Sequence, residues 1–161
     1  MSTPEDTLLL CYDRSEDAKR AIESAGSLFE TRRALVLSVW QPVADVGLVP
    51  WYGETASMVD FAELDRKAAE AGARVAANGV RIAQAAGFEA EPLAVKATQP
   101  VWKTILDVAD THQAAAIVMG SRGLSGVRSL LLGSVSNAVI HHTTRPTLVV
   151  RPSTDEETSK S

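Results

Sequence analysis

Five short apolar runs, separated by stretches of helical periodicity, constrain most strongly what this chain can fold into. Continuous apolar runs of this kind are typical of parallel strands that are buried on both faces. The intervening stretches repeat small or apolar residues every three or four positions, as amphipathic helices do. The expected strands span residues 7–12, 34–40, 88–95, 114–119 and 146–150, and the expected helices span residues 15–30, 61–86, 100–112 and 133–143. This alternation predicts an α/β fold with a parallel sheet and right-handed crossovers.

Pro92 and the alternating pattern around it predict that the third strand lies at an edge of the sheet. The first and fourth strands are apolar throughout, which favours central positions. If the chain steps outward through strands 1, 2 and 3 and then returns beside strand 1, the result is an open five-stranded sheet of order 3-2-1-4-5 with helices on both faces, a Rossmann-like arrangement. Ligands of such sheets bind at the carboxyl ends of the strands that flank the reversal point. Asp13 and Gly120 close the first and fourth strands, so we expect the ligand site between them.

Local signals at the helix ends support these assignments. Ser15 can cap the first helix, and Glu16 and Asp17 then lie in its first turn, where they complement the helix dipole. Gly87 predicts the end of the long second helix, and Pro100 is expected as the first residue of the third. The expected sheet-facing stripe of the second helix is Leu64, Ala68, Ala71, Val75, Gly79, Ile82 and Ala86.

The composition is that of one globular domain of 161 residues, 45% of them hydrophobic and 22% charged. A net charge of −4 without a basic run argues against nucleic acid or an anionic membrane as a partner. No apolar run approaches the ~20 residues that span a bilayer, and the acidic N-terminus does not match a signal peptide. We therefore expect a cytoplasmic protein with one domain over residues 1–152 and a disordered polar tail over 153–161. Cys11, the one cysteine, is expected to be a small buried hydrophobe.

A glycine pattern follows the fourth strand. The pattern begins at Gly120, continues after two residues with Gly123, and ends after nine more residues with Gly133 and Ser134. Glycine permits positive φ and lets a ligand approach the backbone closely. The helix that starts at Gly133 offers free N–H groups and a positive dipole end, both of which suit phosphate. An ordinary loop between a strand and a helix also needs turn residues, so the spacing alone leaves both interpretations open.

Two other features have more than one interpretation. The long aperiodic stretch 41–60, with Trp51 and Tyr52, is either a variable surface excursion or a flap or partner surface. His141 and His142 are adjacent and therefore point in different directions from a helix, which disfavours a metal or catalytic pair. Favourable placement at a helix C-terminus explains them better, and His112 is also expected to end its helix.

These features together resemble the universal stress protein family over residues 7–150. The resemblance rests on Asp13-x-Ser15, on Ile-Val-Met-Gly-Ser-Arg-Gly at 117–123, on Gly-Ser-Val-Ser at 133–136, and on the closing Arg-Pro-Thr-Leu-Val-Val. The ATP-binding branch of the family has Gly-x2-Gly-x9-Gly-Ser/Thr, and this chain has the pattern intact. The resemblance implies an ATP-binding stress-response protein of the cytoplasm.

The resemblance also implies a role for each matching position. Asp13 would lie near the adenosine, the first two glycines would cradle ribose and phosphate, and the start of the last helix would hold the phosphates, with both its serine hydroxyls donating. The implied nucleotide-binding residues are Asp13, Trp40, Gly120, Arg122, Gly123, Gly133, Ser134, Val135 and Ser136. The ligand would be ATP or AMP, with any Mg²⁺ held mainly by phosphates and water. Arg122 and Arg128 could offer charge to phosphate, although a solvated loop face is favoured for Arg128.

The resemblance also implies a dimer, and the chain differs from the family pattern at two positions. Family members tend to pair their fifth strands, which here means a homodimer through Thr147, Leu148, Val149 and Val150, an edge that is otherwise open. Arg14 stands where many relatives have glycine and could crowd the adenine pocket or pair with phosphate. Gln99 replaces a small residue that is common before the third helix.

Catalytic machinery is not evident in the sequence. There is no lysine of the Gly-Lys-Ser/Thr type, and Tyr12-Asp13-Arg14-Ser15 does not match the Ser-Gly-Gly-x-Asp-Ser loop of related adenylating enzymes. A nucleotide-binding regulatory module is therefore expected. The alternatives are a slow Mg²⁺-dependent ATPase or phosphotransferase, and a dimeric scaffold that binds no nucleotide.

Overall fold

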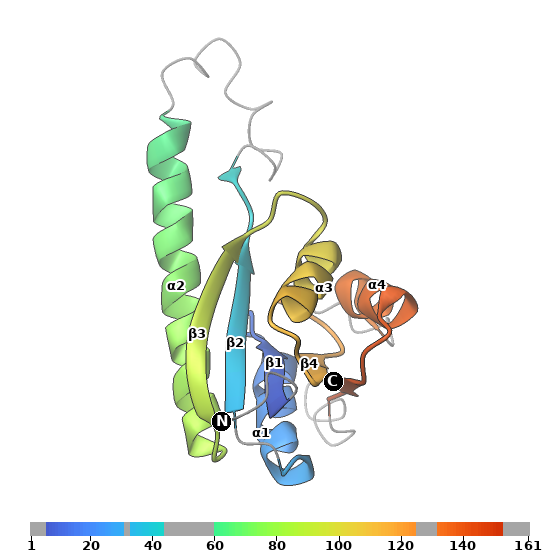
Figure 1. Ribbon diagram of the computed structural model, residues 1–161. Helices are drawn as coiled ribbons and strands as arrows, with labels where there is room; N and C mark the ends of the chain where they lie inside the picture. The colour runs from blue at the N-terminus through green and yellow to red at the C-terminus, as the bar shows by residue number, and fades with distance from the viewer. Residues whose placement is uncertain (1–5, 31–32, 44–59, 125–131, 153–161) are drawn as a thin grey trace, which may run out of the picture.

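The strands form one parallel sheet of order β3-β2-β1-β4-β5, as the sequence predicts (Figure 1). The computed structural model describes residues 6–30, 33–43, 60–124 and 132–152. The elements are β1 Thr7–Cys11, α1 Glu16–Leu28, β2 Arg33–Trp40, α2 Phe61–Ala85, β3 Glu89–Lys96, α3 Val101–Thr111, β4 Ala116–Gly120, α4 Ser134–His142 and β5 Thr147–Val150. The single α/β domain and its strand order are confirmed, with element ends within two residues of those expected.

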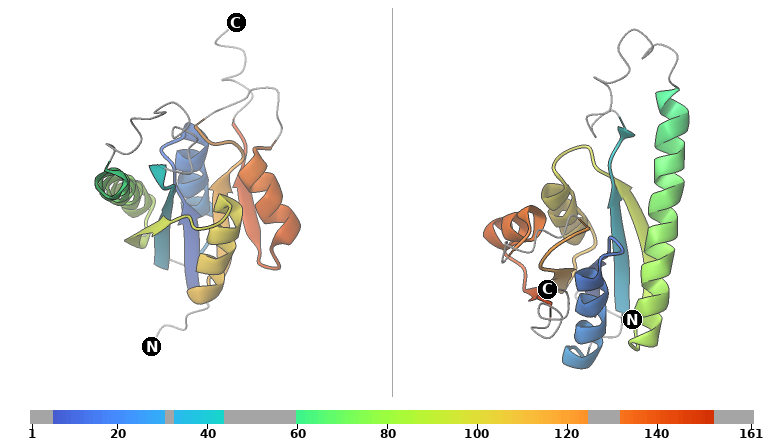
Figure 2. Two further views of the ribbon diagram at one scale, coloured as in Figure 1. Left: turned by 90° about the horizontal axis from the view of Figure 1, so that it is seen from above. Right: turned by 180° about the vertical axis from the view of Figure 1, so that it is seen from behind.

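Helices cover both faces of the sheet (Figure 2). α1 and α2 pack on one face, and α3 and α4 pack on the other. The strand β1 lies at the centre, and its three consecutive leucines, Leu8, Leu9 and Leu10, are all buried because one face meets α1 and the other meets α3. β3 and β5 are the edge strands, so the edge position predicted from Pro92 is confirmed.

The buried stripe of α2 differs from the expected one. Gly72, Ala76, Gly79 and Ala83 face the sheet, whereas Ala71 is exposed. The reason is the bulk of the aromatic rings beneath the helix, since a Cβ atom on Gly72 would lie 2.9 Å from Trp40. The same added atom on Gly79 would lie 2.7 Å from Tyr12. The smallest side chains therefore face the sheet, and Val75 and Ile82 pack at the margin of the core.

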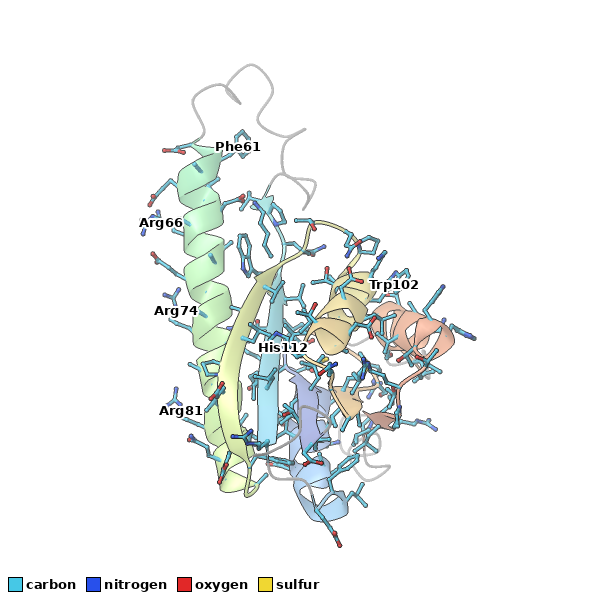
Figure 3. All side chains as sticks on the ribbon, in the orientation of Figure 1. Phe61, Arg66, Arg74, Arg81, Trp102 and His112 are labelled. Carbon is cyan, nitrogen blue, oxygen red and sulfur yellow. The ribbon has the colours of Figure 1, made fainter. Side chains whose placement is uncertain are left out.

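The outer face of α2 is polar. Figure 3 shows Arg66, Arg74 and Arg81 projecting from this helix away from the sheet, and all three are exposed. Arg66 forms ion pairs with Glu63 and Glu70 at 2.7 and 2.5 Å. Exposed pairs of this spacing stabilise a helix by only about 0.3–0.5 kcal/mol each. The fold is therefore held mainly by the two apolar clusters on either side of the sheet.

The helix ends follow the sequence signals closely. Gly87 has φ 95°, and the N–H groups of Gly87 and Phe88 donate to the carbonyls of Gln84 and Ala83, which closes α2. Pro100 is the N-cap of α3, so the helix begins at Val101, one residue later than expected. His112 is the C-cap of α3 and is exposed, so it lies outside that helix's buried stripe. No helix in the described ranges is both long enough and apolar enough to cross a membrane.

Candidate functional site

A cavity of about 190 Å³ opens at the carboxyl ends of β1 and β4, where the strand order reverses. Eight of the nine site residues implied by the sequence line it, and Trp40 does not. The lining residues are Cys11, Tyr12, Asp13, Ser15, Ala18, Leu37, Val39, Val101, Ile105, Met119, Gly120, Ser121, Arg122, Gly123, Gly133, Ser134, Val135 and Ser136. A cavity therefore lies where the sequence predicted the site.

One side of this cavity is apolar. Leu37, Val39, Val101, Ile105 and Met119 come from β2, α3 and β4, and they belong to the core cluster between the sheet and α3. The sequence analysis did not name these residues as site residues. Leu37, Val39 and Met119 share one signal, because each is an apolar strand residue near a carboxyl end on the face that α3 and α4 cover. Val101 and Ile105 lie in the first two turns of α3, the helix that covers this face.

Trp40 lies on the other face of the sheet. Successive strand residues point to opposite faces, so Val39 borders the cavity while Trp40 contacts α2 at Gly72. The amino group of Lys96 lies 5.4 Å from the centre of the Trp40 ring. The geometry thus does not support Trp40 as a ligand contact. The residue of β2 that borders the cavity is Val39, one position earlier.

Asp13 meets the glycine loop across the reversal point. Its Oδ1 accepts a hydrogen bond of 2.9 Å from the N–H of Ser15, which fixes the turn into α1. Its Oδ2 lies 2.9 Å from where a Cβ atom on Gly123 would stand. The two loops therefore approach each other so closely that a side chain at position 123 fits only if the Asp13 carboxylate moves aside.

Arg14 adopts a left-handed backbone conformation, with φ 72°. This conformation costs an ordinary residue roughly 1–2 kcal/mol and glycine almost nothing, which explains why glycine suits this position. The Arg14 side chain is exposed and does not line the cavity, so it neither crowds nor closes the pocket. Gln99 also lies outside the cavity, where its amide donates to Asp107 of α3.

Arg14→Gly is expected to raise the free energy of unfolding by about 0.5–1 kcal/mol, because relief of the backbone strain exceeds the added flexibility of the unfolded chain. Urea unfolding measures the change. Arg14→Ala is the matched control, since it removes the same charge and keeps the strained Cβ, and it should stay within about 0.5 kcal/mol of wild type. Equal stabilisation by both variants would contradict the backbone explanation.

The glycine loop is shaped by packing within the protein. A Cβ atom on Gly120 would lie 2.7 Å from the backbone N of Ala18 and 2.7 Å from Cβ of Asp17, so β4 can approach α1 only with glycine there. Positive φ is not the reason, since Gly87 is the one described glycine with that conformation. Gly133 is the N-cap of α4, with φ −70°.

Ser121 joins this loop to both neighbouring helices. Its hydroxyl donates to Oδ2 of Asp17 in α1 at 3.1 Å. Its carbonyl accepts from the N–H of Gly133 at 2.6 Å and from the hydroxyl of Ser136 at 2.7 Å. The Ser136 proton is thus engaged inside the protein, and Ser134 is the exposed serine of the pair at the cavity.

The helices that begin beside the cavity differ in their N-termini. α3 has neither a cap from the described side chains nor an acidic residue in its first turn, but Val101 is the one residue of that turn that lines the cavity. α1 has a side-chain cap, because Oγ of Ser15 accepts from the N–H of Ala18 at 3.2 Å, and two acidic residues lie in its first turn. α4 begins at a glycine, has no acidic residue in its first turn, and receives no cap from any described side chain. Because Ser134, Val135 and Ser136 all line the cavity, α4 offers it more free N–H groups, and so more positive potential, than α1 or α3.

Asp17 contacts two residues of the cavity wall, although the sequence analysis expected it only to complement the dipole of α1. It is buried, and its Oδ2 pairs with Nε of Arg122 at 3.4 Å as well as with Ser121. An acidic residue in a first turn ordinarily faces solvent, so no local pattern indicated this contact. Arg122, expected to face phosphate, is already paired with a carboxylate at the cavity wall.

Cys11 lines the cavity as a neutral thiol. Burial, together with the nearby charge of Asp13, raises the pKa of its thiol to about 12. Burial also raises the pKa of the Tyr12 phenol, with smaller contributions from Asp13 and Glu16, and this phenol donates to Asn78 of α2 at 2.7 Å. Both groups are thus uncharged at neutral pH.

Native Cys11 is expected to react with a disulfide reagent at pH 8 at least about 100-fold more slowly than a free cysteine, because only the thiolate attacks. Absorbance of the released thiolate follows the reaction. The same protein in denaturant provides the control, since its one cysteine should then react at the ordinary rate. Rapid reaction of the folded protein would contradict a raised thiol pKa.

The remaining sequence expectations fall into two groups. Arg128 and residues 44–59, which include Trp51 and Tyr52, lie outside the described residues. His142 lies in the last turn of α4, as expected; its ring stacks on Trp102 at 4.4 Å and its Nδ1 lies 2.8 Å from the carbonyl of Ala138. Among the described residues, no three His, Cys, Asp or Glu side chains gather in a metal-binding group.

Comparison with known proteins gives a consistent result. The model of the universal stress protein family matches residues 5–151. A universal stress protein of Thermus aquaticus is 33% identical over 90% of this chain and 98% of its own length. Universal stress protein UspA from Lactobacillus plantarum has a similar structure, with a TM-score of 0.65, 22% identity and coverage of 93% of this chain and 100% of that chain. The universal stress protein from Archaeoglobus fulgidus in complex with dAMP has a TM-score of 0.60, 22% identity and coverage of 89% and 96%. The chain therefore belongs to the universal stress protein family.

Proposed function

We propose that this protein is a cytoplasmic, dimeric module that binds adenine nucleotide, ATP in particular, and regulates a stress response. The observation that carries this proposal is the division of the cavity into an apolar wall and an uncapped helix N-terminus. An apolar slot suits a purine, and the free N–H groups at the start of α4 suit phosphate oxygens. A nucleotide is a molecule that needs both an apolar slot for its base and N–H donors for its phosphates.

The family and the intact glycine pattern support the choice of adenine. A relative of the same fold forms a complex with dAMP, which contains the purine and one phosphate of the proposed ligand. The proposed contacts are Asp13 beside the adenosine, and Gly120 and Gly123 beside ribose and phosphate. At the phosphates they are the backbone N–H groups of Ser134, Val135 and Ser136, with Gly133 and Arg122 adjoining. AMP is a weaker ligand in this scheme because it presents fewer phosphate oxygens to α4. Mg²⁺, if bound with ATP, is held by the phosphates and water.

Calorimetry and mass spectrometry test the proposal directly. Native mass spectrometry of protein purified from cells is expected to show a co-purified adenine nucleotide, and titration of stripped protein with ATP should give saturable heat. Titration with GTP is the matched control for base recognition. The absence of any heat with ATP or AMP at millimolar ligand would overturn the nucleotide proposal and favour the scaffold alternative.

A homodimer through β5 is part of the proposal. β5 pairs with β4 on one side, and its four residues are half-buried at the edge of the sheet. An exposed edge of this kind is a template for pairing with a second copy. Light scattering is expected to give twice the chain mass of 17.1 kDa. A monomer at micromolar concentration would remove this part of the proposal and leave the nucleotide part intact.

A slow ATPase is the second candidate, since one carboxylate lines the cavity. Asp13 could orient a water, but its Oδ1 already accepts from Ser15, and no other described lining residue is a carboxylate, histidine or lysine. Turnover is therefore expected to stay below about 1 s⁻¹, the low end of ordinary enzymes. Phosphate release with and without Mg²⁺, in wild type and Asp13→Ala, separates the two candidates.

A further inference from the structure

Asp17 and Arg122 form an ion pair in the wall of the cavity. Nε of Arg122 lies 3.4 Å from Oδ2 of Asp17, and only 15% of the Arg122 side chain and 10% of the Asp17 side chain is exposed. Ser121 donates to the same carboxylate oxygen at 3.1 Å. This arrangement holds the carboxylate in one position, so the pair is a fixed part of the site.

The two partners lie at different depths relative to the cavity. Arg122 lines it, whereas Asp17 does not and is enclosed behind the loop. The backbone of Arg122 adjoins the start of α4, since a Cβ atom on Gly133 would lie 3.5 Å from Cα of Arg122. The backbone of Arg122 therefore adjoins that end of the cavity, and its guanidinium, held 3.4 Å from Asp17, belongs to the cavity wall.

The carboxylate opposes the charge that the guanidinium presents there. A pair of opposite charges acts at a distance as a dipole, so its attraction for a further anion is much weaker than that of the cation alone. Burial enhances this effect, because water screens neither partner well. Asp17 thus determines how much of the Arg122 charge reaches a ligand.

We propose that Asp17 is a specificity-determining residue of the nucleotide site: by neutralising Arg122, it limits how strongly the site favours nucleotides that have more phosphate charge. The inference rests on the proposed nucleotide-binding function. In this proposal Asp17, which does not line the cavity, sets the preference between adenosine, AMP and ATP.

Calorimetry with adenosine, AMP and ATP at one fixed ionic strength tests the assignment. Asp17→Asn keeps an oxygen that accepts from Ser121 and removes the charge. The Kd for ATP is expected to fall about tenfold and that for AMP about threefold, while the Kd for adenosine stays unchanged, since attraction scales with ligand charge. Arg122→Gln should shift the same values in the opposite direction, because the Asp17 charge is then unopposed.

Two further variants separate charge from shape. The double variant Asp17→Asn with Arg122→Gln removes a neutral pair, so its Kd for ATP is expected within about threefold of wild type. Glu16→Gln is the matched control: it removes an exposed acid from the same turn of α1 and should change the Kd for ATP by less than about twofold.

The result that would overturn the inference is an equal change in Kd for all three ligands, or none for ATP. If Asp17→Asn does not fold, Arg122→Gln alone decides: weaker binding of ATP with adenosine unaffected supports the inference, and unchanged ATP binding rejects it. A wild-type protein that binds none of the ligands rejects the proposed function instead.

Discussion

Gly123→Val is expected to abolish detectable ATP binding while the protein stays folded. A Cβ atom at this position would lie 2.9 Å from Oδ2 of Asp13, so a branched side chain fills the gap between the ends of β1 and β4. Among the described residues, this flexible carboxylate is the one group within 4 Å, and it can rotate away without moving the backbone. Calorimetry should show no saturable heat with millimolar ATP, against a saturable curve for wild type.

Two observations make this result specific to the site. The circular dichroism spectrum of Gly123→Val should match that of wild type, and its unfolding midpoint should fall by only a few degrees. Gly123→Ala gives a graded comparison, because the single methyl group leaves more of the gap open and should weaken ATP binding less. If Gly123→Val binds ATP as wild type does, the nucleotide does not pass between the two loops.

Gly120→Ala is expected to lower the free energy of unfolding by about 2–3 kcal/mol, the cost of overpacking in a tight interior. The added Cβ atom would lie 2.7 Å from Ala18 N and from both the carbonyl carbon and Cβ of Asp17. Two of these three atoms belong to the backbone of α1, which cannot yield unless the helix moves. Urea unfolding followed by circular dichroism measures the loss, at an unchanged slope m.

Gly123→Ala is the matched control for this stability effect. It makes the same substitution three residues later, where a side-chain carboxylate is the opposing group, and its free energy of unfolding should stay within about 0.5 kcal/mol of wild type. Equal stability of the two variants would contradict the close approach of β4 to α1. The two glycines of one motif thus have separable tasks, one in the fold and one in the site.

The fold was predictable because its signals are local and strong. Three consecutive leucines at 8–10 can be buried together only in a central strand, and Pro92 can be accommodated only at an edge. The order of the strands then follows from a single reversal. The stripe of α2 was correct at Gly79 and one position early at Ala71, because the bulk of Trp40, which selects Gly72, is a tertiary effect.

The site was predictable in its position and only partly in its contacts. Asp13 and Gly120 were expected to border the site, since they close the strands that flank the reversal point, and both line the cavity. The pairing of Asp17 with Arg122 joins residues 105 positions apart, and no spacing rule links them. Trp40 was included among the residues that the family resemblance implied, whereas the alternation of side chains along β2 brings Val39 to the cavity instead.

Ser121 bridges two helices that lie on opposite faces of the sheet, α1 through its hydroxyl and α4 through its carbonyl. A ligand that orders the first turn of α4 restrains this serine and, through it, the first turn of α1. On the proposed function, occupancy of the cavity is therefore expected to affect α1 on the far side of the sheet through these hydrogen bonds. Its signature is slower amide hydrogen exchange at the start of α1, a surface where another protein can distinguish the loaded from the empty form.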